Sequence, residues 1–60
     1  MTIEQPVERR MLIFAALVKS QDEGTPVRLS RSQVAGTFGI TTSEVAVIEK
    51  EGLAHGWPPL

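Results

Sequence analysis

The sequence contains no cysteine and only one histidine, His55, among its 60 residues. A chain without cysteine forms neither disulfides nor thiolate metal sites. A single histidine has no second imidazole with which to complete a zinc or iron site. We therefore expect no metal and no cofactor. The absence of cysteine also fits a reducing compartment such as the cytoplasm.

Long hydrophobic runs and an excess of one charge are missing as well. The longest apolar run, Met11 to Val18, has eight residues, whereas a transmembrane helix needs about 20. The formal net charge is −1, and 22% of the residues are charged. This balance does not indicate a strongly basic nucleic-acid-binding protein or a membrane-surface peptide. We expect no membrane association and a cytoplasmic protein.

The short length limits the classes of function. Residues 1–60 suffice for one small domain, and a domain of this size buries only about 60% of the surface that its unfolded chain exposes. An apolar fraction of 42% is typical of a folded domain rather than a disordered chain. The sequence shows no nucleophile–base pair and no metal cluster. We therefore expect a folded domain that is not an enzyme.

Apolar residues recur at helical spacing over residues 6–21, which predicts the first helix. Pro6 suits its first position, because the N–H that proline lacks would have no partner there. Leu12, Ile13 and Ala16 lie off the main apolar stripe, and three short helices cannot easily cover a helix that is apolar on several sides. We expect these three residues to form the interface of a homo-oligomer. Packing within the core of the single chain is the alternative.

Two capping boxes predict where the next helices begin. In a capping box, each of two side chains three residues apart accepts a hydrogen bond from the backbone N–H of the other residue. Ser30 with Gln33 makes one such pair, and Thr41 with Glu44 makes the other. These boxes predict helices over 31–38 and 42–51.

Glycines mark the predicted helix ends. Gly39 lies between the second and third helices, where the chain must turn sharply. Gly52 suits the left-handed position that follows a helix. Residues 53–60 then form a tail, and we expect Trp57 and Leu60 to cover the core. The alternative is an extended tail that docks on another protein.

A short helix, a tight turn that contains Gly39 and a second short helix form the layout of a helix-turn-helix. Ala35 is small at a point where the two helices approach closely. Apolar residues at the inward positions hold the two helices together: Val34, Phe38, Ile40, Val45 and Ile48. The sequence predicts an all-α fold, a compact three-helix domain with a helix-turn-helix.

The chain resembles the helix-turn-helix in the promoter-reading C-terminal domain of bacterial sigma factors, and it is similar to small phage-type repressors. The resemblance rests on the pattern Val34-Ala35-x-x-Phe38-Gly39-Ile40-Thr41-x-x-Glu44-Val45-x-x-Ile48-Glu49. It implies regulation of transcription, with the second helix of the pair in the major groove of double-stranded DNA. Sigma factors carry arginines on the outward side of that helix, where this chain has none.

The candidate DNA contacts are two arginines before the turn and the outward residues of the third helix. Arginine and lysine bind phosphates, hydroxyls bind phosphates or base edges, and apolar side chains contact thymine methyl groups. The full set is Arg28, Arg31, Thr41, Thr42, Ser43, Ala46, Val47 and Lys50. A homodimer would double this small set and add half-site spacing as a source of specificity.

The charge of the last third of the chain supports an alternative function. From residue 41 to the end there are three glutamates and one lysine, which gives a net charge of −2. The outward residues Ala46 and Val47 are apolar, as in a protein-binding surface. The alternative is a protein-interaction module, an adaptor or inhibitor, on a helix-turn-helix fold that has lost DNA binding.

Overall fold

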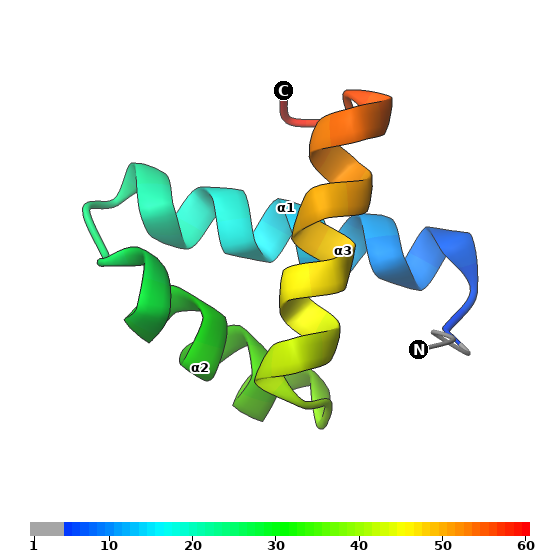
Figure 1. Cartoon of the computed structure of the whole chain (residues 1–60). Coiled ribbons are helices and arrows are strands. Elements are labelled where there is room, and N and C mark those ends of the chain that lie inside the picture. The colour runs from blue at the N-terminus through cyan, green and yellow to red at the C-terminus, as the bar shows by residue number, and fades with distance from the viewer. Residues whose placement is uncertain (1–4) are drawn as a thin grey trace.

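Three helices make up most of residues 5–60, the part of the chain that the structure, a computed structural model, describes. They are α1 (Val7–Asp22), α2 (Val27–Phe38) and α3 (Thr42–His55). Each helix packs against the other two, and α3 starts beside the end of α2 and then crosses α1 (Figure 1). No strand occurs within residues 5–60. The predicted all-α, three-helix domain is confirmed.

The start of α2 differs from the prediction. The helix begins at Val27 with Pro26 as its N-cap, four residues before the predicted start at Arg31. Ser30 is not a cap but a fully buried helical residue, whose hydroxyl donates to the Val27 carbonyl over 2.8 Å. Leu29, just before it, is half exposed. Pro26 decides the start, because its φ of −56° suits a helix entrance and its carbonyl accepts the first helical hydrogen bond.

The start of α3 agrees with the prediction. The Thr41 hydroxyl accepts a hydrogen bond from the Glu44 backbone N–H, and the Glu44 carboxylate accepts one from the Thr41 N–H, each at 3.1 Å. The capping box is therefore confirmed. Gly39 ends α2 with a φ of +69°, a left-handed conformation that glycine adopts without strain. Residues 39–41 thus turn the chain sharply from α2 into α3.

The end of α3 lies further along the chain than predicted. The helix continues through Gly52 to His55, and Gly56 takes the left-handed position with a φ of +62°. Gly52 is buried against the ring of Phe14, where a β-carbon would overlap the ring carbons. The prediction that Gly52 ends the helix is wrong, because this glycine serves the contact between α1 and α3 instead.

The core explains why α1 is apolar on several sides. It contains Ile13, Phe14, Leu17, Val34, Ala35, Val45, Ile48 and Trp57. Since α2 and α3 both pack on α1, the chain itself covers two sides of this helix. Ile13 has no exposed surface, so its predicted place in an oligomer interface is wrong. Ala16 is half-buried against the same core, and only Leu12 of that set is largely exposed, at 63%.

The tail covers one end of the core. The Trp57 ring meets Phe14 edge to face, with ring centroids 6.1 Å apart, and only 9% of Trp57 is exposed. The expected role of Trp57 is therefore confirmed. Leu60 is 62% exposed and does not share that role.

Candidate functional site

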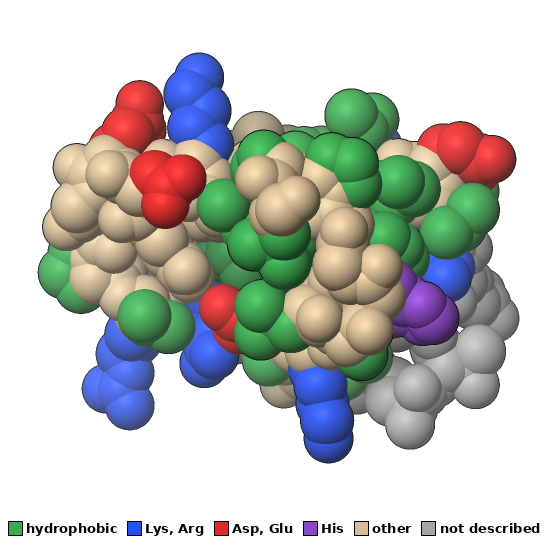
Figure 2. Space-filling view, turned by 90° about the horizontal axis from the view of Figure 1, so that it is seen from above, with side chains coloured by type: hydrophobic (Ala, Val, Ile, Leu, Met, Phe, Trp, Pro, Cys, Tyr) green, Lys and Arg blue, Asp and Glu red, His purple; other side chains and the backbone are tan. Residues whose placement is uncertain are grey.

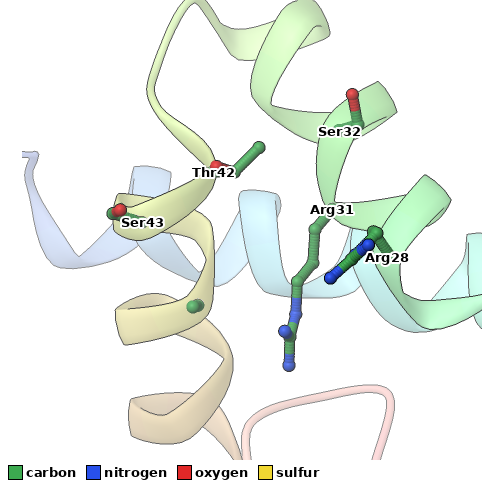
Figure 3. A pocket seen from close by; sticks show the side chains of 6 residues that line it. Arg28, Arg31, Ser32, Thr42 and Ser43 are labelled. Atoms are coloured by element: carbon green, nitrogen blue, oxygen red, sulfur yellow. The ribbon is translucent and has the colours of Figure 1, made fainter.

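A hollow of about 540 Å³ opens between the first halves of α2 and α3. Figure 3 shows two guanidinium groups on one side of it and two hydroxyl-bearing residues on the other. Five of its six lining residues belong to the predicted DNA-contact set, and the sixth, Ser32, does not. The lining residues are Arg28, Arg31, Ser32, Thr42, Ser43 and Ala46.

Local helix geometry places these side chains together. Arg28 lies three residues before Arg31 and four before Ser32, so all three project from one side of α2. The sharp turn at 39–41 brings the first residues of α3, Thr42 and Ser43, back beside that side. The first turns of both helices therefore lie at the hollow, where the partial positive charge of a helix N-terminus favours an anion; in α3 the Glu44 N–H is already bonded in the capping box. The hollow is suited to bind an anion.

The two arginines differ in their surroundings. Arg28 is exposed and has no carboxylate within ion-pair distance among residues 5–60. Arg31 is held by Glu49 of α3: its Nε and Nη2 both donate to Glu49 Oε1, over 3.0 and 2.5 Å. Arg28 is therefore free to bind a ligand, whereas Arg31 already has a partner.

A polar network extends from this ion pair into the domain. The Gln21 amide donates to Glu49 Oε2 at 3.2 Å and to the Ser30 hydroxyl at 3.3 Å. The network therefore joins all three helices beside the hollow. Nothing local in the sequence indicates it, because Glu49 is 18 residues from Arg31 and 28 from Gln21.

Three predicted contact residues lie outside the lining of the hollow. The Thr41 hydroxyl is engaged in the capping box. Val47 and Lys50 are exposed on α3, and with Ser43 they are spaced to share one side of that helix. Figure 2 shows lysine and arginine side chains projecting along the lower edge of the view, with an acidic side chain among them. The predicted contact set does not include Ser32. The predicted helix starts at residue 31, after Arg28, so it does not place Ser32 and Arg28 on one side of the same helix.

A second ion pair lies between α1 and α3. Arg10 donates from Nε and Nη2 to the two oxygens of Glu51, at 2.8 and 3.0 Å, and from Nη1 to the Gln5 carbonyl at 2.6 Å. The hydrogen bond to Glu51 raises the pKa of Arg10 above its ordinary value. Arg10 therefore stays charged and helps to hold α3 on α1.

A smaller hollow of about 300 Å³ lies between the last turns of α1 and α2. Lys19 and Glu23 line it with opposite charges, beside the half-buried Phe38. The mixed charge gives no preference for an anion. The hollow beside Arg28 is therefore the stronger candidate site.

No protein-family model matches the chain, and no curated protein or solved structure is significantly similar to it. None of the helices formed by residues 5–60 has the length and apolar character needed to cross a bilayer.

Proposed function

We propose that the chain is a small DNA-binding transcriptional regulator that works in the cytoplasm and catalyses no reaction. The first half of α3 enters the major groove, and the start of α2 lies on the phosphate backbone, as in a helix-turn-helix. The observation that carries this proposal is the shared hollow, where the Arg28 guanidinium lies across from the hydroxyl-bearing residues Thr42 and Ser43.

The side chains of this face suit the parts of a DNA duplex. Arg28 and Lys50 supply positive charge for phosphates, the main source of DNA affinity. Thr42 and Ser43 offer hydroxyls that donate to and accept from base edges, and Ala46 is small enough for contact with a thymine methyl group. The face therefore has groups that bind the DNA phosphates and a few groups that distinguish base pairs.

We further propose that the chain binds DNA as a homodimer. One copy presents few uncompensated positive charges beside the hollow, and a second copy doubles them. Leu12 supports self-association, because it is a large apolar side chain that is 63% exposed on α1. A two-fold dimer would place two α3 helices at a fixed spacing along the duplex.

A matched pair of lysine variants tests the proposed DNA-binding face. Lys50→Glu places a negative charge on α3 beside the hollow, while Lys19→Glu makes the same change on α1, beside the smaller hollow. In a titration against mixed-sequence duplex DNA, the first variant weakens binding strongly and the second does so only slightly. Equal effects of both variants would refute the proposed face.

The alternative function, a protein-interaction module, is favoured by one observation. Val47 is 41% exposed in the middle of the proposed DNA-binding face, where an apolar side chain adds nothing to phosphate binding. If the face binds a protein, the wild type shows no salt-dependent affinity for duplex DNA.

A further inference from the structure

Glu49 accepts hydrogen bonds from the edge of the Arg31 guanidinium with which arginines commonly bind phosphates. Arginine binds carboxylates and phosphates through the same planar fork of N–H donors. In Arg31, the fork edge formed by Nε and Nη2 is directed at Glu49 Oε1. The carboxylate therefore takes the place that a DNA phosphate would take beside the hollow.

We propose that Glu49 is an internal competitor of the DNA phosphate for Arg31, and that it thereby limits the affinity of this face for DNA. This inference rests on the proposed function, since the ligand that it excludes is the one assigned above. It concerns regulation of the same site. Arg31 thus differs from Arg28, which has no carboxylate partner within the described part of the chain.

The surroundings of the ion pair favour Glu49 as a competitor for Arg31. The Glu49 side chain is only 15% exposed, and Gln21 holds its second oxygen from α1. The Arg31 side chain is 38% exposed and lines the hollow. Glu49 is therefore fixed within the domain, while the Arg31 side chain is partly exposed and borders the hollow that a ligand can enter.

Two opposite effects of Glu49 can be separated by experiment. As a positioning residue, Glu49 would orient Arg31 for the phosphate, and its removal would weaken binding. As a competitor, it cancels the charge and occupies the donors, so its removal strengthens binding. The Arg31–Glu49 pair is largely buried on the Glu49 side and is supported by Gln21, so breaking it costs part of the free energy that a phosphate contact with Arg31 would gain. The competitor role therefore predicts tighter binding in the variant.

Glu49→Gln and Glu51→Gln form a matched pair for this test. Both replace one glutamate of α3 with its isosteric amide and change the net charge equally, but Glu51 pairs with Arg10 on the side of α1. For mixed-sequence duplex DNA at about 0.1 M salt, we expect Glu49→Gln to bind roughly five- to tenfold more tightly, the gain of about one phosphate contact. Glu51→Gln stays near the wild type, and adding Arg31→Gln to Glu49→Gln removes the gain.

A second measurement tests the inference without DNA. Inorganic phosphate is titrated into ¹⁵N-labelled protein while the Arg31 Nε–H signal is followed by NMR. The signal shifts in Glu49→Gln and stays nearly constant in the wild type if Glu49 competes for this donor. If that difference appears but no variant binds DNA, the competitor role stands and the proposed DNA-binding function fails.

Two results would overturn the inference itself. One is that both proteins bind DNA and Glu49→Gln binds it no more tightly than the wild type; the other is an equal response of Arg31 to phosphate in both proteins. Circular dichroism checks that each variant is folded. If Glu49→Gln is unfolded at the assay temperature, Glu49→Met is compared instead, because methionine keeps the stem and the helix propensity without the charge.

Discussion

Gly52 of α3 lies directly against the aromatic ring of Phe14 in α1. An added β-carbon would overlap the ring, and Phe14 has no room to move because it is fully buried and is covered by Trp57. The close approach of α1 and α3 therefore depends on a residue without a side chain.

Gly52→Ala is expected to lower the free energy of unfolding. The gain in helix propensity is about 1 kcal/mol, but overpacking costs about 1–3 kcal/mol and more where a ring cannot shift, so we expect a net loss of about 1–2 kcal/mol. Gly36→Ala is the matched control, because Gly36 lies in α2 with open space around it. That variant should gain about 0.5–1 kcal/mol. Urea unfolding measures both, and a stabilised Gly52→Ala would contradict the contact.

Thr41→Ala and Thr42→Ala should separate stability from binding. The first removes the hydroxyl that caps α3 and should cost about 1 kcal/mol of unfolding free energy. The second removes a hydroxyl-bearing residue that lines the hollow but makes no cap, so it should change DNA binding unevenly among sequences and leave stability nearly unchanged. Thermal unfolding with parallel DNA titrations checks this. The same loss of stability in both variants would argue against the assigned cap.

Leu12→Glu and Ile13→Glu should affect assembly differently. Leu12 is exposed, so its variant stays folded and shifts a homodimer to monomers. Ile13 is fully buried, so its variant unfolds, because an unpaired charge is very unfavourable in an apolar core. Sedimentation velocity with circular dichroism distinguishes the two results. A wild-type chain that stays monomeric at high concentration would exclude the proposed dimer.

Val47→Asp and Val7→Asp test the extent of the DNA-binding face. The two valines have similar exposure, 41% and 43%, but only Val47 lies on α3 near Ser43 and Lys50. Both variants should stay folded. A carboxylate at 47 repels the DNA phosphates and weakens binding, whereas one at 7 has little effect on affinity. Unchanged DNA binding by Val47→Asp would place the DNA contacts elsewhere.

The elements that the sequence predicts correctly depend on local chemistry. The box of Thr41 and Glu44 and the turn at Gly39 need only neighbouring residues, and both are found. Ser30 with Gln33 carries the same signal, but Pro26 starts the helix first and Ser30 becomes buried. Local capping patterns therefore indicate possible starts without choosing among them.

The features that the sequence did not reveal depend on contacts between distant residues. Gly52 has the pattern of a helix end, and only the packing of Phe14 explains a glycine inside α3. Arg31 was predicted as a DNA contact, but its partner Glu49 comes from another helix and changes its role. The sequence nevertheless predicts five of the six residues that line the hollow, because the expected helix-turn-helix layout assigns the arginines before the turn and the outward side of α3 to one face.

The salt dependence of DNA binding tests the central claim most directly. Fluorescence anisotropy of a labelled mixed-sequence duplex is measured for the wild type and Arg28→Gln over a series of salt concentrations. The account predicts that log K falls linearly with log salt in the wild type, and that the slope becomes shallower by about 0.9 in Arg28→Gln for the lost phosphate contact. Binding that does not depend on salt, or no binding to duplex DNA even at low salt, would contradict it.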